Sequence, residues 1–123
     1  MHLTRTRTLT VALATVLTLS GLAAPATAAG NGACTDPSGV TVVVDFTDVG
    51  GSVETGCATA PTTGTDALQQ AGFVDTRDAS GLICAIDATP DPCPATFTGS
   101  YWSYWSAPAG GEWESYQVGS DTS

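Results

Sequence analysis

The feature that most constrains this chain is its set of four cysteines, at Cys34, Cys57, Cys84 and Cys93. Their separations of 23, 27 and 9 residues do not match the paired short spacing of a structural zinc site. In an exported chain without other soft metal ligands, four cysteines indicate two disulfides, for which three connectivities are possible. We favour the pairing 34–57 and 84–93, because each pair brackets a predicted turn or hairpin.

The N-terminus has the parts of an export signal. Arg5 and Arg7 give a positive start, an apolar run follows at 9–24, and Ala26-Thr27-Ala28 fits the small-residue cleavage rule. We therefore predict a signal peptide over 1–28, cleaved near Ala28, and a secreted protein. The apolar run is shorter than the roughly 20 residues of a membrane span, so no membrane insertion of the mature chain is expected.

The composition of the mature chain excludes several kinds of chemistry. It contains no histidine and no lysine, and its one base, Arg77, stands against twelve carboxylates, a formal net charge of −11. Histidine-activated nucleophiles, Schiff-base lysines and imidazole metal ligands are therefore absent, and nucleic acid would be repelled. The carboxylates lack the spacing of a calcium loop, and so short a chain rarely builds a glycosidase cleft. We expect a non-catalytic protein with no metal and no resident cofactor.

The first half of the mature chain predicts a hairpin. Residues 29–39 are rich in turn-formers and predict a flexible N-terminal lead-in, after which one small domain is expected over 40–123. The β-branched run at 40–46 predicts a strand whose even-numbered residues share one face. A turn at Gly50-Gly51 and a returning strand at 53–58 complete the hairpin.

A short helix is predicted next. Thr63 and Asp66 have the spacing of a capping box, and Gly72 lies where a helix end takes a left-handed residue. A helix of about two turns that packs on the sheet is therefore expected. The residues that follow, including Asp75, Arg77 and Asp78, are predicted to form a solvated loop.

Three further strands are predicted, at 82–88, 100–106 and 112–118. The resulting order is β-β-α-β-β-β, which is typical of the α+β class. The simplest closed arrangement is β-grasp-like (ββαβββ), an antiparallel or mixed sheet with one short helix on one face, stapled by two disulfides.

Four of the nine aromatic rings fall within residues 101–105, and they have two possible roles. Alternation along a strand sends Tyr101 and Trp105 to one face and Trp102 and Tyr104 to the other. Both pairs can be structural, one as core and one as a solvated ladder. Alternatively, the pair that the short helix leaves uncovered forms a binding surface with residues of the next strand. The candidate ligand-binding residues are Tyr101, Trp102, Tyr104, Trp105, Trp113 and Tyr116.

The proline-rich loop Pro90–Pro94 supports a function of another class. It is stiff and contains Cys93, and small secreted protease inhibitors use preorganised loops of this kind to enter an active site. An ordinary cross-linked turn explains the same residues. The alternatives to a ligand-binding module are therefore a protease inhibitor or a structural cell-surface interaction domain.

Several motifs follow one another in an order that resembles a group of small exported actinobacterial proteins. They are GVTVVVDF at 39–46, the helix at Thr63–Phe73, the strand at Cys84–Asp87, Pro92–Cys93 and the aromatic stretch Tyr101–Trp105. The group is similar to the C-terminal, β-grasp-like domain of transcobalamin and intrinsic factor, which covers one side of cobalamin. The resemblance implies a cobalamin-like or other flat small ligand, or a cell-surface or transport protein, as the partner. It implies that Tyr101, Trp102, Tyr104 and Trp105 form the binding face.

The same resemblance implies an unpaired sheet edge. Family members usually continue past the strand that contains Trp113 and Tyr116 into a glycine-led turn and a final strand, whereas here the sequence reads VGSDTS at 118–123. An edge left open in this way would permit pairing with a strand of a partner.

Overall fold

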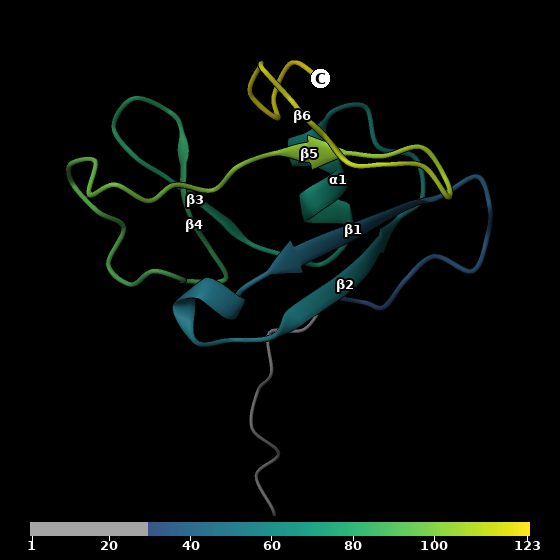
Figure 1. The fold of residues 1–123 in the computed structure, drawn as a ribbon, viewed down its shortest axis with the longest axis horizontal. Coiled ribbons are helices and arrows are strands. Elements are labelled where there is room, and N and C mark those ends of the chain that lie inside the picture. Colours follow the sequence, from purple (N-terminus) through teal and green to yellow (C-terminus); the bar gives the residue numbers. More distant parts are fainter. Residues whose placement is uncertain (1–29) are drawn as a thin grey trace, which may run out of the picture.

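The computed structural model describes residues 30–123 (Figure 1), so the predicted signal peptide at 1–28 lies outside the described residues. The elements in this range are β1 (Val40–Asp45), the 3-10 turn η1 (Thr47–Val49), β2 (Val53–Ala58), α1 (Gly64–Gln70), β3 (Asp75–Arg77), β4 (Ile83–Ile86), β5 (Trp105–Ser106) and β6 (Glu114–Ser115). They make a small α+β fold in which every strand pair is antiparallel. None of its helices in this range is long and apolar enough to cross a bilayer.

The strands β1 and β2 form the hairpin that the β-branched run predicts. Val44 and Phe46 are buried, with 4% and 6% of their surface exposed, whereas Val43, which precedes Val44, is 42% exposed. This alternation is the one expected for a strand with one face on a core. Gly50 closes the η1 turn with a φ of 85°, in the left-handed region that glycine adopts without steric cost.

The helix α1 begins and ends as predicted. The hydroxyl oxygen of Thr63 accepts a hydrogen bond from the backbone N–H of Asp66 at 3.1 Å, and Gly72 follows the helix with a φ of 93°. The second half of the capping box is displaced by one residue, since the Asp66 carboxylate accepts from the backbone N–H of Thr62 at 2.8 Å. Seven residues are too few for a stable isolated helix, so α1 depends on its packing.

A small core joins this helix to the strands. Its buried members are Val44, Phe46, Leu68, Ala71, Phe73 and Ile86, and the partly buried Val42, Ile83 and Trp102 pack around them. The closest approach of α1 to β2 is at Gly56, where an added Cβ would overlap the carbonyl oxygen of Ala71. Glycine is required there because no side chain fits between the two backbones.

The strands after α1 differ from the prediction in extent. The prediction of a loop at 75–78 is wrong for its first part, because β3 pairs with β4 in a short irregular hairpin. The strands expected at 100–106 and 112–118 reduce to β5 and β6, which pair only with each other. Trp102 and Tyr104 of the first segment are half-buried, but most of the backbone of this segment has no ladder partner among the described residues, and a strand requires one.

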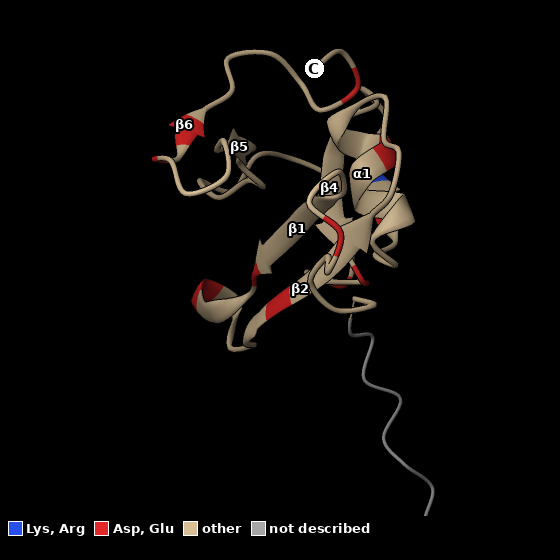
Figure 2. Cartoon of the chain, turned by 90° about the vertical axis from the view of Figure 1, so that its right-hand side faces the viewer, with Lys and Arg blue, Asp and Glu red and all other residues tan. Residues whose placement is uncertain are grey.

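The strands form three separate two-stranded sheets within residues 30–123, β1-β2, β3-β4 and β5-β6, where a single sheet was expected. In Figure 2 the strands β5 and β6 lie on the side away from α1, whereas β4 contributes Ile86 to the core. The α+β class with one α-helix is confirmed in the described residues. The β-grasp connectivity stays a prediction.

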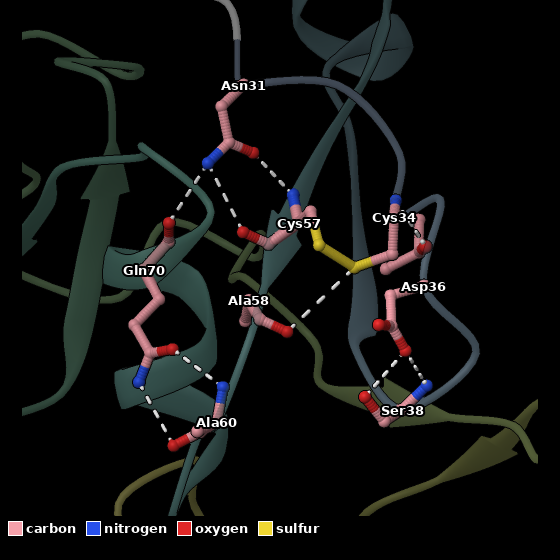
Figure 3. Close-up of a disulfide and its surroundings, with 9 residues drawn as sticks. Asn31, Cys34, Asp36, Ser38, Cys57, Ala58, Ala60 and Gln70 are labelled. Atoms are coloured by element: carbon pink, nitrogen blue, oxygen red, sulfur yellow. Dashed lines mark hydrogen bonds between the residues drawn. A yellow bond between two sulfur atoms is a disulfide. The ribbon is translucent and has the colours of Figure 1, made fainter.

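Both predicted disulfides are present, with Cα–Cα distances of 4.7 Å for Cys34–Cys57 and 5.5 Å for Cys84–Cys93. Beside the first bond (Figure 3), the side-chain amide of Asn31 donates to the carbonyl oxygens of Cys57 and Gln70, each at 3.2 Å. The start of the described chain is therefore held on β2 and α1 by a covalent bond and by hydrogen bonds.

Candidate functional site

Trp102 lies against the core. Its ring meets Phe46 edge to face, with centroids 5.4 Å apart, and its indole Nε1 donates to the carbonyl oxygen of Thr89 at 3.2 Å. A tryptophan placed in this way contributes to stability both by burying its apolar ring and by hydrogen bonding its indole N–H. Of the six candidate residues, Trp102 is the one whose contacts with the core are most evident.

Tyr104 and Tyr116 connect the C-terminal hairpin to α1. Their ring centroids are 4.9 Å apart, and the backbone N–H of Tyr116 donates to the carbonyl oxygen of Tyr104 at 2.9 Å. The Tyr104 ring lies directly over Gly64, where an added Cβ would come within 2.6 Å of its hydroxyl. Tyr104 is half-buried and Tyr116 is 40% exposed, so this pair is partly available to a partner.

Three candidate residues are open to solvent. Tyr101, Trp105 and Trp113 have 77%, 47% and 58% of their surface exposed, and we call them the exposed aromatic set. Trp105 pairs with Ser115 across the β5–β6 ladder, so these two side chains share a face. Trp113 is two residues before Ser115, and alternation in an extended backbone assigns it to the same face. The indole Nε1 of Trp105 donates to the hydroxyl of Ser103 at 3.0 Å, which fixes the ring locally.

Phe97 is a further exposed aromatic residue that the sequence analysis missed. It is 76% exposed, and its ring centroid lies 6.4 Å from that of Tyr101. It precedes the aromatic segment in the stretch ATFTG, which carries no strand or helix pattern. The only available signal was a large apolar residue in a loop, and such residues are common on protein surfaces.

The surroundings of the exposed aromatic set are acidic. Glu112 and Glu114, both exposed, flank Trp113 in the sequence. Figure 2 shows acidic positions spread over several elements and loops of the described chain, and one basic position beside α1. A ligand that approaches these rings therefore meets negative charge, which favours neutral or cationic molecules.

The basic position is Arg77, which organises a charged cluster. Its guanidinium donates to the carboxylate of Asp75 at 2.9 Å and to Asp121 at 2.6 and 2.9 Å, and it also reaches the Thr65 hydroxyl at 3.1 Å. Because Thr65 also donates its backbone N–H to Ser120, the cluster fixes the C-terminal segment to the start of α1. The expectation of a solvated loop is wrong for Asp75 and Arg77, which lie in β3, and Arg77 binds the distant Asp121, whereas Asp78 does lie in a loop.

The cluster changes the acidity of its members. Hydrogen bonds from Arg77 and then from Thr65 hold the pKa of Asp121 below its ordinary value. Burial acts against ionisation of Asp75, but hydrogen bonds from Gln69 and Arg77 outweigh it, so that pKa is also lowered. The Asp121 hydrogen bond, in turn, raises the pKa of Arg77. All three groups are charged at neutral pH.

A shallow hollow beside Phe46 contains two carboxylates, those of Glu54 and Asp87. It is lined by Phe46, Gly50, Ser52, Glu54, Asp87 and Thr89, among others. One oxygen of Glu54 and one of Asp87 are buried without a hydrogen-bond partner among the described residues. In residues 30–123, however, no group of three or more histidine, cysteine or acidic side chains has an arrangement that could hold a metal ion.

The loop of the alternative hypothesis, Pro90–Pro94, is tethered at two points. The Cys84–Cys93 disulfide holds one end, and the Trp102 indole binds the carbonyl oxygen of Thr89 at the other. Asp91 and Pro92 at the tip are exposed. This is the geometry of a presented loop, and it is also that of an ordinary cross-linked turn.

The six candidate residues are therefore divided by the structure. Trp102 packs on the core, Tyr104 and Tyr116 join the C-terminal hairpin to α1, and the exposed aromatic set of Tyr101, Trp105 and Trp113 faces solvent. Comparisons of this chain with protein-family models, with curated proteins and with solved structures returned no match.

Proposed function

We propose that this chain is a non-catalytic binding module that uses the exposed aromatic set to hold a small, flat ligand. The observation that carries the proposal is the exposure of Tyr101, Trp105 and Trp113 in a molecule whose core is small. Aromatic rings left in water lose the favourable free energy of burial, and a flat partner that stacks on them recovers it. Large apolar side chains left exposed on a small protein are typical of interaction sites where they share a face.

A corrinoid is the first ligand to test. The motif resemblance described above supports it, and so does the position of α1 against the β1–β2 hairpin, which is one part of a β-grasp-like arrangement. The proposal includes secretion, which the two disulfides support because such bonds persist in oxidising compartments. A cell-surface or transport protein that receives the ligand would be the corresponding partner.

Equilibrium dialysis against cyanocobalamin tests the proposal directly. We expect the unmodified protein to retain the ligand, and the double variant Trp105→Ala, Trp113→Ala to bind at least about tenfold more weakly, since stacked aromatic anchors carry most of the energy of such sites. Val49→Ala is the matched control, because it removes an exposed apolar side chain from η1, away from the set. Far-ultraviolet circular dichroism establishes that each variant is folded.

Two results would contradict the proposal. If the unmodified protein does not retain cyanocobalamin, a corrinoid is excluded as the ligand. If the double variant retains it equally well, the exposed aromatic set is excluded as the binding site. Inhibition of a serine protease that is lost in the variant Pro92→Ala would instead favour the inhibitor hypothesis.

A further inference from the structure

The hydrogen-bonding pattern of the β1–β2 hairpin defines which backbone groups point outward. The N–H of Phe46 donates to the carbonyl oxygen of Ser52 at 3.1 Å, and the register continues without a shift from there to Val40 and Ala58. In an antiparallel ladder, hydrogen-bonded pairs alternate with pairs that are not bonded to each other. The even-numbered residues of β1 therefore bond to β2, and Thr41, Val43 and Asp45 direct their backbone N–H and C=O groups to the opposite edge.

The corresponding outward groups of β2 are covered by the chain itself. The N–H of Gly32 donates to the carbonyl oxygen of Thr55 at 3.1 Å, and the side chain of Asn31 bonds to both the N–H and the C=O of Cys57 (Figure 3). Thr55 and Cys57 are two of the three odd-numbered positions of β2 that the alternation assigns to this edge, which supports the assignment for β1. Residues 31–32 thus cover this edge of the hairpin at Thr55 and Cys57.

The edge of β1 has no such cover. No backbone group of Thr41, Val43 or Asp45 forms a hydrogen bond with any residue in the described part of the chain outside the ladder. The segment that leads into β5 packs Trp102 on Phe46, but it supplies no hydrogen bond to this edge. Thr41, Val43 and Asp45 are all exposed residues. The backbone groups of this edge therefore have no hydrogen-bond partner within residues 30–123.

Natural proteins usually protect such an edge with proline, lysine, a bulge or a very short strand. β1 has none of these in its six residues, and its sequence VTVVVD has a high strand propensity. An unprotected edge of this kind is the template for β-strand addition, in which main-chain hydrogen bonds supply the affinity and alternate side chains the specificity.

The charge of the molecule determines which strand can be added. Asp45 lies on the edge and Asp48 follows it in η1, while the one base of the described chain, Arg77, is occupied by Asp75 and Asp121. A second copy of this chain would bring a like net charge to the edge and be repelled. An extended segment with lysine or arginine side chains would be attracted.

We propose that the free edge of β1 binds an extended, basic segment of another protein, which adds to the β1–β2 hairpin as a third strand. This interaction surface is distinct from the exposed aromatic set, and it does not depend on the function proposed above. Hydrogen bonds from Thr41, Val43 and Asp45 hold the backbone of the segment. Its basic side chains are selected by the acidic residues at the end of β1.

The test is amide hydrogen exchange followed by NMR, with a short peptide that alternates lysine and valine as the probe. We expect saturating peptide to slow exchange of the Thr41, Val43 and Asp45 amides by at least about tenfold, as closure of an open edge requires. The same peptide with N-methylated backbone nitrogens retains its charge and side chains, but it lacks the backbone N–H groups that would donate hydrogen bonds to β1. It should bind at least about tenfold more weakly, as should a peptide with glutamate in place of lysine.

A protein variant gives an independent measurement. Val43→Pro removes an N–H that the ladder with β2 does not use, and proline is tolerated at edge positions of this kind. It should weaken binding of the lysine peptide, whereas Val49→Ala should not. Four results would overturn the proposal. They are equal binding of the N-methylated peptide, protection confined to residues 105–115, slow exchange of the three amides without peptide, and protection that depends on protein concentration alone.

Discussion

Arg77 is the one basic residue within residues 30–123, and its contacts join several segments. Its side chain donates to groups in β3, in α1, in the loop after β3 and in the C-terminal segment, so one side chain joins segments that are far apart in the sequence. The sequence placed Asp75 and Asp78 beside it and indicated only a charged loop. Asp121 belongs to a different segment, and no local pattern connects it with Arg77. The spacing of residues in the sequence does not predict ion pairs of this kind, because the two partners belong to distant segments.

Replacement of Asp121 should make the pH dependence of this contact measurable. The pKa of Asp121 is lowered in the folded state by the Arg77 and Thr65 hydrogen bonds, so its contribution to stability is present above the unfolded pKa of about 3.9. That contribution is lost as the pH falls through the folded value. Asp121→Asn should therefore lower the thermal unfolding midpoint at pH 6, and the difference from the unmodified protein should shrink as the pH falls below about 4.

Asp91→Asn is the control for this measurement, because Asp91 is exposed and forms no hydrogen bond or ion pair in the described part of the chain. Its midpoint should follow that of the unmodified protein throughout. A difference for Asp121→Asn that stays constant from pH 6 to pH 3 would show that the carboxylate does not stabilise the cluster through its charge.

At the scale of elements, the parts that the sequence predicts well are those with local signals. The β1–β2 hairpin follows from a β-branched run and a double-glycine turn, and α1 follows from Thr63 and Gly72 at its ends. β3 was missed because three polar residues carry no periodicity, and their pairing depends on β4 and on Arg77.

The aromatic segment shows the same limit in the candidate site. Alternation correctly separates the exposed Tyr101 and Trp105 from the half-buried Trp102 and Tyr104. It does not reveal that the backbone forms a ladder only at β5, because pairing depends on where the opposite strand lies. The face to which a side chain points depends only on the local extended backbone. Formation of a sheet depends on two segments, because each strand needs a hydrogen-bonded partner.

The contact between α1 and β2 can be tested at Gly56. Gly56→Ala places a Cβ against the carbonyl oxygen of Ala71, so the helix must move away from the sheet. Overpacking of this kind should reduce the free energy of unfolding by about 1–3 kcal/mol, measured by urea denaturation. Gly119→Ala is the matched control, since its added Cβ meets no atom and its φ is unstrained. A loss of stability for Gly119→Ala equal to that for Gly56→Ala would show that the close approach is not the cause.

For the whole molecule, the disulfides compensate for a small core. Six residues form the buried cluster, and a domain of this size has a total stability of about 5–10 kcal/mol, which is small beside the entropy lost on folding. The formal net charge of −11 in the predicted mature chain adds self-repulsion. Covalent closure reduces the entropy of the unfolded chain, and it does so more for a longer loop.

The two bonds should therefore differ in their contribution. Replacing Cys34 and Cys57 by serine opens a loop of 23 residues and should cost about 3.4 kcal/mol in the free energy of unfolding. Replacing Cys84 and Cys93 opens a loop of 9 residues and should cost about 2.6 kcal/mol. Urea denaturation at fixed ionic strength measures both, with the unmodified oxidised protein as reference. The first pair of replacements should also loosen the cover that Asn31 gives to β2, because Cys34 anchors that segment. A larger loss from the second pair would mean that contacts of the Pro90–Pro94 loop, rather than chain entropy, determine what each bond contributes.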